Sequence, residues 1–404
     1  MNQIKINSVH HLPHCSATHA SIHHATKFKI CTESMLSAPK SAVIDGIISY
    51  GGSTGIGLNL PRKAYGEYFE RNHLFTAVPI DEKKPLSRVE PLAFQNKLLT
   101  LCSQNPKTSE VNQEHLFSLT KVHNLFDNKL QDYFYNAISL NGLKEDAPYL
   151  GYCDSCACAS HPIKQKALYN SMMEFLERQA LLGSWLSQTC QYAINPALLK
   201  DVTPYSDLTD KLLENGSLHI FANGNQLPGH SVIMFYFAHS EKDMVQYSIG
   251  ASSGLSLQEA LISSLEELYQ CYTFLYNMEC SSGLENKAGS GYHLSFQQCN
   301  YRGVKETIPF FKQPVPLQIS TLDELHAVRI FSYQDILTEL EELTTDIYYY
   351  HFYDRSLNLH FTKIMSPDFF AHMSLTKTLN FENLYAKKLG ITRENAYLAK
   401  IPFP

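Results

Sequence analysis

Three segments of the chain carry the same helical pattern, and this internal repeat constrains the fold more than any other feature. Each segment has a glutamate with a small residue three positions before it and Glu or Gln three positions after it. The segments are residues 62–75, 163–185 and 257–276, and their shared glutamates are Glu67, Glu174 and Glu267. The copies are roughly a hundred residues apart, which is too far for a solenoid of stacked repeats. We therefore expect an α+β fold with three related strand-loop-helix units around a common centre.

A stretch of small residues precedes each of these helices. Residues 42–50 form a predicted strand rich in β-branched side chains, and the glycine-rich residues 51–57 follow it as a loop. Residues 151–161 form a small-residue loop before the second helix. A strand at 245–249 and a loop at 250–254 come before the third. Loops of this composition allow backbone N–H groups to approach phosphate oxygens.

The first two helices each present a pair of carboxylates, because residues three apart share a helix face. The pairs are Glu67 with Glu70 and Glu174 with Glu177. On a single helix such a pair is usually a solvated ladder, with Arg71 or Arg178 as its neighbour. Carboxylates that converge repel one another unless cations lie between them, and Mg²⁺ prefers carboxylate and phosphate oxygens. Since arginine binds phosphate, a magnesium–nucleotide site is the alternative hypothesis to the solvated ladder.

Common nucleotide and nucleophile motifs do not occur in these segments. Residues 51–57 lack the Gly-Lys-Ser/Thr ending of a Walker loop. The ribose-binding acid of a dinucleotide fingerprint is not evident, and no Gly-x-Ser-x-Gly elbow occurs. A nucleotide site on this chain would therefore be of another type.

Composition argues against several other classes of protein. The chain has 33 Lys and Arg against 39 Asp and Glu, and its net charge of -6 argues against binding to nucleic acid or to an anionic membrane. The longest apolar run, residues 232–238, is far shorter than the ~20 residues of a spanning helix. Residues 1–7 do not resemble a signal peptide. With ten cysteines and no secretion signal, we expect reduced thiols in a cytoplasmic protein.

Two clusters raise the question of a bound metal. Cys153, Cys156 and Cys158 have metal-like spacing, but no second close pair completes a four-ligand zinc site, so small buried thiols are the favoured interpretation. Residues 1–44 form a predicted polar N-terminal arm. Histidine-rich tracts can bind metal, but packing of the arm on the domain or on a partner is favoured. The histidines of this tract are His10, His11, His14, His19, His23 and His24.

In combination, these segments resemble the YcaO-type cyclodehydratases, and most of all the microcin-type members of that family. The stretches that carry the resemblance are residues 66–71, 174–179, 362–370 and 402–404. The resemblance extends from about residue 45 to residue 404. It implies a YcaO-type fold in which the three units surround a nucleotide site. It also implies a catalytic domain at 45–404 with a proline-rich C-terminal tail, after the arm at 1–44.

The resemblance implies ATP and Mg²⁺ as cofactors and a ribosomally made precursor peptide as substrate. A Cys, Ser or Thr of the peptide attacks the preceding carbonyl, ATP phosphorylates the resulting oxygen, and loss of phosphate leaves a thiazoline or oxazoline. The implied metal ligands are Glu67, Glu70, Glu174, Glu177 and Glu267. The implied nucleotide contacts are Arg71, Ser155, Arg178 and Gln270. The implied catalytic tail contains Pro402 and Pro404, with the Pro404 carboxylate as a base; a disordered tail is the alternative.

Resemblance to the microcin-type members also implies a hetero-oligomeric complex. Its other subunits would be an E1-like zinc-containing protein that binds the leader peptide and an FMN-dependent dehydrogenase that oxidises azolines to azoles. Lys63, Pro162 and Lys166 depart from the family pattern. Lys166 leaves open a non-catalytic, nucleotide-binding scaffold of the complex. Thioamide formation is a second alternative within the family, and the Pro-Phe-Pro ending argues against it.

Overall fold

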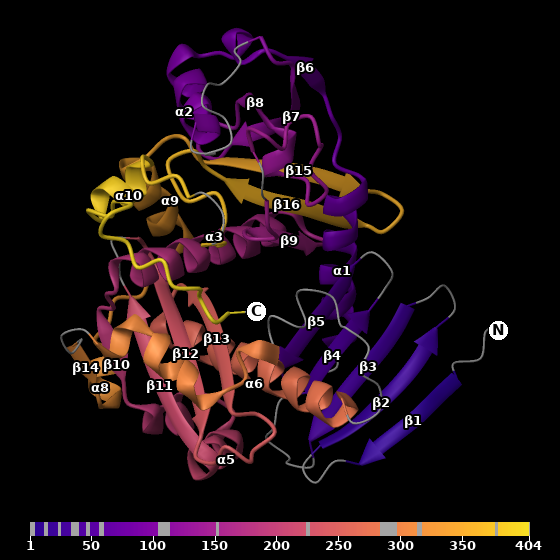
Figure 1. Ribbon diagram of the computed structural model, residues 1–404, viewed down its shortest axis with the longest axis vertical. Helices are drawn as coiled ribbons and strands as arrows, with labels where there is room; N and C mark the ends of the chain where they lie inside the picture. The colour runs from indigo at the N-terminus through magenta and orange to yellow at the C-terminus, as the bar shows by residue number, and fades with distance from the viewer. Residues whose placement is uncertain are drawn as a thin grey trace. The chain divides into compact units, whose positions relative to one another are not determined.

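Helices and strands occur throughout the chain, which confirms the expected mixed α+β fold (Figure 1). In the computed structural model, the residues described are 5–11, 15–22, 26–33, 40–45, 49–55, 60–103, 114–150, 153–223, 227–282, 297–312, 317–375 and 379–403. Of these, only the backbone is described at 5–11, 15–22, 26–33, 40, 41, 43, 45, 103, 223 and 277–282. Contacts divide the chain into two compact units. Unit 1 contains residues 1–68, 188–332 and 401–404, and unit 2 contains residues 69–187 and 333–400.

The first sheet of unit 1 is antiparallel, with its five strands in sequence order. The strands are β1 (Lys5–His11), β2 (Cys15–Ile22), β3 (Thr26–Glu33), β4 (Lys40–Asp45) and β5 (Tyr50–Gly55). The described residues of the expected arm, residues 1–44, therefore lie in strands β1 to β4. The boundary after residue 44 stays a prediction. Helix α1 (Leu60–Thr76) follows β5. A small core of Ala42, Ile44, Leu60 and Ala64 packs between the sheet and the helix.

The second sheet of unit 1 has the strand order β13-β12-β11-β10-β14. The strands are β10 (Tyr192–Ile194), β11 (Gly216–Asn223), β12 (His230–Ala238), β13 (Tyr247–Gly254) and β14 (Leu317–Ile319). Neighbouring strands are antiparallel, except that β10 and β14 are parallel. Helix α6 (Leu257–Ser282) packs on β13 and β12 (Figure 1). The helices and short 3-10 turns around this sheet are η3 (Pro196–Leu198), α4 (Leu199–Val202), α5 (Ser206–Asn215), η4 (Arg302–Thr307), η5 (Pro309–Phe311) and α8 (Leu322–His326).

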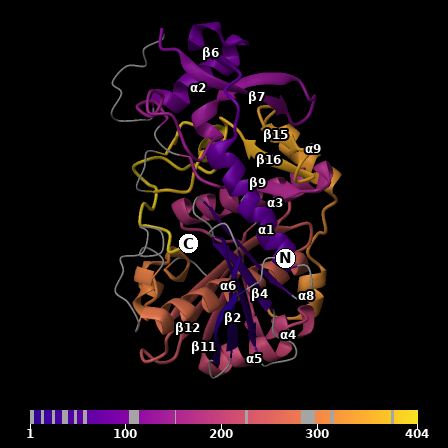
Figure 2. The same cartoon turned by 90° about the vertical axis from the view of Figure 1, so that its right-hand side faces the viewer.

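Unit 2 contains a sheet with the order β6-β7-β15-β16-β9, in which β8 also pairs with β7. The strands are β6 (Glu82–Lys84), β7 (Phe117–Asn124), β8 (Leu130–Phe134), β9 (Cys158–His161), β15 (Tyr348–Asp354) and β16 (Leu359–Met365). Helix α3 (Lys164–Ser187) packs on β9 and β16 (Figure 2). The remaining short elements are η1 (Leu86–Arg88), α2 (Leu92–Ser103), η2 (Tyr135–Ala137), α9 (Tyr333–Leu343) and α10 (Leu384–Lys388).

The three expected helices are confirmed as α1, α3 and α6, but the loops expected before them are largely strands. The small residues 51–55 lie in β5, residues 250–254 lie in β13, and residues 158–161 lie in β9. Among the described strands, each of these three ends the path of its sheet and precedes its helix. The convergence of three strand-loop-helix units on one centre stays a prediction.

Close contact between strand and helix explains why these strands consist of small residues. A Cβ on Gly51 would lie 2.1 Å from the carbonyl oxygen of Ala64, and a Cβ on Gly250 would lie 2.1 Å from that of Ser264. Any side chain at either glycine would therefore overlap the helix backbone. Ala64 and Ser264, three positions before Glu67 and Glu267, are small for the same reason, because they face these glycines. The loop prediction was wrong because small residues were taken as a sign of turns rather than of close packing.

One histidine in the aromatic part of unit 2 makes stability depend on pH. His73 of α1 is stacked on Phe361 at 4.5 Å between ring centroids, and its Nε2 lies 2.8 Å from the Tyr350 hydroxyl. Burial lowers the pKa of His73 to about 4, and the charge of Asp354 opposes this shift only in part. The unfolded chain takes up a proton near pH 6.5, whereas the folded chain resists it until about pH 4. Stability is therefore complete above pH 6.5 and is lost as the pH falls through that window.

Because His73 is protonated in the unfolded chain but not in the folded chain, we expect the free energy of unfolding to fall by about 2 kcal/mol between pH 6.5 and pH 5. Urea unfolding followed by the fluorescence of Trp185, which is fully buried in unit 2, measures the loss. His73→Phe should make the dependence on pH shallower, while replacement of the exposed His326 by Phe should not. An equal slope in all three proteins would contradict the prediction.

No helix in the described part of the chain is long and apolar enough to cross a membrane.

Candidate functional site

The glutamates shared by α1 and α6 are each hydrogen-bonded to the strand that precedes their helix. In unit 1, the N–H of Gly52 in β5 donates to Glu67 Oε2 at 2.5 Å, and the N–H of Ala251 in β13 donates to Glu267 Oε2 at 2.7 Å. These bonds orient the carboxylates, as outer hydrogen bonds orient metal ligands in proteins. A carboxylate has two oxygens and several lone pairs, so one such bond does not exhaust its capacity as a ligand.

Gln270, the expected nucleotide contact on α6, lies beside the same strand as Glu67. The Thr54 hydroxyl donates to Gln270 Oε1 at 3.0 Å. A Cβ on Gly52 would lie 2.8 Å from Gln270 Nε2, so Gly52 lies between Glu67 of α1 and Gln270 of α6. The structure therefore brings Glu67 and Gln270 to one strand, although the sequence separates them widely.

Glu266 is a second acidic residue of α6 that the sequence did not single out. The Tyr205 hydroxyl donates to Glu266 Oε1, and the carboxylate borders Gly55 at the end of β5. Burial raises the pKa of Glu266, while the bond from Tyr205 and the charge of Lys63 act in the opposite direction. Lys63, one of the departures from the family pattern, thus acts electrostatically on a carboxylate adjacent to Glu267.

In unit 2, Glu174, Glu177 and Arg178 meet on α3. Arg178 Nη2 lies 3.6 Å from Glu174 Oε1, and its Nη1 lies 3.3 Å from Glu177 Oε1. The three side chains are 27%, 11% and 15% exposed. The pairing with Arg178 matches the helix-ladder interpretation, but the setting is more enclosed than an open surface. Two carboxylates and one guanidinium leave one negative charge, which attracts a further cation more strongly where water is partly excluded.

Glu70 of α1 lies near the same part of unit 2 and is buried. Burial raises the pKa of Cys158, Lys363 opposes the shift, and the charges of Glu70 and Glu174 raise it further. Both carboxylates are therefore close enough to Cys158 to act on one thiol. Arg71, the next residue of α1, is half-buried. The structure thus brings Glu70 of α1 and Glu174 of α3 to a common neighbour.

The segment that contains Ser155 is fixed from two sides. Lys363 of β16, only 4% exposed, donates from Nζ to the Asp154 carbonyl oxygen at 2.6 Å. The Asp154 carboxylate accepts the N–H of Cys156 at 3.1 Å and the N–H of Met373 at 2.8 Å. Ser155, the expected nucleotide contact, is partly exposed between these anchored residues. The family resemblance named Ser155 but not Lys363 and Asp154, which fix the segment around it.

The cysteines of this segment are free thiols. Burial raises the pKa of Cys153, Cys156 and Cys158, so all three are protonated at neutral pH. Cys153 Sγ lies 2.9 Å from Lys363 Nζ, which donates to it. Within the described ranges, no group of three or more His, Cys, Asp or Glu side chains is placed to hold a metal ion. The carboxylate pair on α3 nevertheless has the hard oxygens that suit Mg²⁺, which commonly binds through one or two carboxylates together with phosphates and water.

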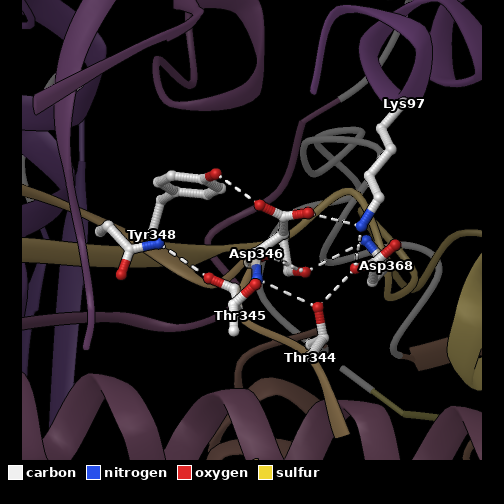
Figure 3. Close-up of polar contacts among 8 residues, drawn as sticks. Lys97, Thr344, Thr345, Asp346, Tyr348 and Asp368 are labelled. Atoms are coloured by element: carbon white, nitrogen blue, oxygen red, sulfur yellow. Dashed lines mark hydrogen bonds and ion pairs between the residues drawn. The ribbon is translucent and has the colours of Figure 1, made fainter. Parts of the chain in front are cut away.

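A partly buried ionic cluster holds Asp368, which belongs to the stretch that carries the family resemblance (Figure 3). Lys97 Nζ of α2 donates to Asp368 Oδ2 at 2.6 Å and to Asp346 Oδ2 at 2.5 Å. The Thr344 hydroxyl donates to Asp368 and the Tyr348 hydroxyl donates to Asp346 (Figure 3). Burial alone would lower the pKa of Lys97, but the bonds and charges of the two aspartates outweigh it and raise the pKa. The lysine therefore stays charged and fixes the start of this segment.

The same segment braces the site helix. Gln179 of α3 donates from Nε2 to the Phe370 carbonyl at 2.9 Å, and the Phe370 N–H donates to Gln179 Oε1 at 3.0 Å. Two residues later, His372 is buried, and Met373 binds Asp154 as described above. Residues 366–373 thus connect the ionic cluster to α3 and to the Ser155 segment. Their role is to position the site rather than to supply its charges.

The C-terminal residues are ordered by two hydrogen bonds, one in each unit. In unit 2, Trp185 Nε1 donates to the Ala399 carbonyl at 2.8 Å. In unit 1, the Tyr247 hydroxyl donates to the Pro402 carbonyl at 2.6 Å. Pro402 is buried and Phe403 is partly exposed, so the alternative of a disordered tail is wrong up to residue 403. Pro404 lies outside the described residues.

The expected site residues are distributed over the two units. Unit 1 contains Glu67, Glu267, Gln270 and Pro402, and unit 2 contains Glu70, Arg71, Ser155, Glu174, Glu177 and Arg178. Among the departures from the family pattern, Lys63 and Lys166 are exposed and Pro162 is partly exposed.

Comparison with known proteins identifies the family. Residues 62–369, which include the five glutamates expected as metal ligands, match the model of the family described as YcaO cyclodehydratase, ATP- and Mg²⁺-binding. The chain belongs to the YcaO cyclodehydratase family. It is a homologue of the microcin B17-processing protein McbD of Escherichia coli, with 28% identity over 355 residues that make up 84% of this chain and 87% of McbD.

Solved structures of YcaO proteins share the fold. A chain of the E. coli microcin synthetase McbBCD complex matches with a TM-score of 0.81 and 24% identity, covering 94% of this chain and 96% of that chain. The same complex with pro-MccB17 bound matches equally well. The YcaO protein of Methanopyrus kandleri, bound with AMPPCP and Mg²⁺, matches with a TM-score of 0.52 and 12% identity over 89% of this chain and 85% of that chain. The expected YcaO-type fold is therefore confirmed.

Proposed function

We propose that this YcaO protein is the ATP- and Mg²⁺-dependent cyclodehydratase subunit of an azole-forming peptide synthetase. The observation that carries the proposal is the enclosed group of Glu174, Glu177 and Arg178 on α3. It lies within the residues that match a family described as binding ATP and Mg²⁺. On this proposal, Glu67, Glu70 and Glu267 are further magnesium ligands. Arg71, Ser155, Arg178 and Gln270 contact the nucleotide.

Each side chain has a task that its surroundings suit. ATP, when bound, supplies the phosphoryl group that turns a poor oxygen leaving group into a good one. Glu174 and Glu177 would hold the cation, and Arg178 would stabilise the negative charge that develops on the phosphates. The strand N–H groups that donate to Glu67 and Glu267 keep those carboxylates oriented.

The C-terminal tail is proposed to act on the peptide rather than on the nucleotide. Ring formation requires removal of a proton from the attacking thiol or hydroxyl and from the backbone amide. The carboxylate of Pro404 is the proposed base. Pro402 keeps the segment stiff, since proline fixes its own φ. The hydrogen bond from Tyr247 to Pro402 supports this proposal, because it places the tail against β13.

Substrate and partners are proposed by analogy with the relatives. McbD is named for processing microcin B17, and the McbBCD complex is known with pro-MccB17 bound. We infer that this chain acts on a ribosomal precursor peptide within a hetero-oligomeric complex in the cytoplasm. Its partners would be an E1-like zinc-containing leader-binding subunit and an FMN-dependent azoline dehydrogenase.

Ring formation in a reconstituted complex tests the proposal. We expect the chain, its co-encoded partners, the precursor peptide and Mg-ATP to give a peptide lighter by one water per ring, with one phosphate released for each. Mass spectrometry without the flavin subunit isolates the azoline step. A thioamide enzyme would instead exchange oxygen for sulfur when sulfide is added. A scaffold would show neither ATP turnover nor a change in peptide mass, and either of these results would overturn the proposal.

A further inference from the structure

One buried tyrosine of unit 1 contacts the tail that the proposed mechanism uses. The Tyr247 hydroxyl donates to the Pro402 carbonyl at 2.6 Å, and Tyr247 has no exposed surface. Ile401 and Pro402 are buried as well. A carbonyl that is removed from water needs a partner, because leaving it unpaired costs free energy comparable to a lost hydrogen bond. The hydroxyl of Tyr247 supplies that partner.

Tyr247 is itself fixed in three ways, so it can define a position. Its N–H donates to Asn300 Oδ1 at 3.2 Å. It pairs with Phe237 across β12 and β13, and the two rings pack at 5.6 Å between centroids. The backbone of Tyr247, its register on β12 and its ring are therefore all restrained independently of the hydrogen bond to Pro402.

The same strand also holds the proposed metal ligand Glu267. Ala251, four residues after Tyr247, donates its N–H to Glu267 Oε2 at 2.7 Å. Four residues of a strand span about 13 Å. The Ser248 hydroxyl donates to the Leu268 carbonyl at 2.8 Å, and Gly250 touches the backbone of α6, so β13 cannot slide along the helix. One rigid strand thus sets the distance between the tail and Glu267.

We propose that Tyr247 is a positioning residue for cyclodehydration, which fixes the C-terminal segment on β13 in register with Glu267. This inference rests on the proposed function. It adds a side chain that contacts neither nucleotide nor peptide and acts through the tail. Phenylalanine at this position would fill the same volume, so the hydroxyl alone carries the proposed role.

The test compares Tyr247→Phe with the native chain in the reconstituted complex. We expect kcat for ring formation to fall about tenfold, the effect of losing one well-placed hydrogen bond. We expect Mg-ATP affinity and the KM for the precursor peptide to stay unchanged. A merely structural role would instead disturb these binding constants together with kcat. Tyr236→Phe is the matched control, because Tyr236 is equally buried on the neighbouring strand β12 and packs against Tyr272.

A double-mutant comparison makes the test specific to the tail. In a chain that lacks residues 402–404, Tyr247→Phe should cause no further loss of kcat, because the hydroxyl no longer has its target. A further tenfold loss would overturn the proposal. So would a Tyr247→Phe variant of the full chain with native kcat.

Hydrogen–deuterium exchange separates failure of this inference from failure of the proposed function. Exchange at the amides of Lys400, Ile401 and Phe403 should speed up in Tyr247→Phe and not in Tyr236→Phe. This measurement needs no activity. If the native complex formed no azoline, the proposed function would fail. Unchanged exchange in Tyr247→Phe would still refute fixation of the tail by Tyr247, and faster exchange would still support that fixation.

Discussion

Glu174→Gln is expected to weaken Mg-ATP binding more than a hundredfold while leaving the fold intact, and Glu177→Gln is expected to do the same. Either change removes one negative charge and keeps the shape of the side chain. The remaining carboxylate is then balanced by Arg178, whose guanidinium lies 3.3 to 3.6 Å from the two acids in the native chain. Loss of one ligand charge weakens the attraction for magnesium, and the loss is large because the side chains are mostly shielded from water.

Calorimetric titration with ATP, with and without Mg²⁺, measures this prediction. The affinity for metal-free ATP should change little, since the change acts on the cation. Glu341→Gln, on an exposed position of α9 in the same unit, is the control and should bind as the native chain does. If Glu174 and Glu177 serve only as ion-pair partners of Arg178, the variants will melt at lower temperature but bind Mg-ATP normally, and that result would refute the proposed site.

Deletion of residues 402–404 should reduce azoline formation about a hundredfold or more and leave Mg-ATP affinity unchanged. General base catalysis commonly contributes about 10²–10⁴ to a rate, and the proposed base is lost with these residues. The fold should survive, because the preceding part of the tail keeps its own anchors. Trp185 still donates to the Ala399 carbonyl, and the Tyr397 N–H still donates to the Leu186 carbonyl.

Single-turnover mass spectrometry of the precursor peptide, together with calorimetry, separates the two effects. Leu398→Ala is a suitable control, because Leu398 is exposed in the same segment and precedes the deleted residues. A truncated chain that forms azolines at the native rate would remove the tail from the mechanism. A truncated chain that no longer binds Mg-ATP would place the tail in the nucleotide site instead.

The sequence predicted the site helices well because their pattern is local. Helical period and the spacing of Glu67, Glu174 and Glu267 belong to single segments, and α1, α3 and α6 all form where they were expected. The strands were harder to predict. β5 and β13 are rich in Gly, Ser, Thr and Ala, residues that often indicate turns. Contact with the helix backbone at Gly51 and Gly250 explains the small residues there.

The groups that position the site could not be found from the sequence. Lys97 lies far from Asp346 and Asp368 along the chain, and Lys363 lies equally far from Asp154. Such pairs are created by tertiary contacts and leave no periodic signal. Tyr247 and Glu266 were missed for a similar reason, because a buried tyrosine or a helix carboxylate is ordinary until its partner is known.

The contact of Gly51 and Gly250 with bare helix backbone has a consequence for divergence within the family. At these two points the geometry between strand and carboxylate depends on main-chain atoms, which are the same in every protein. Most core side chains can therefore be exchanged without moving Glu67 or Glu267, provided that glycine remains in the strand and a small residue remains on the helix. This tolerance is one physical reason why a protein with only 12% identical residues can still share this fold.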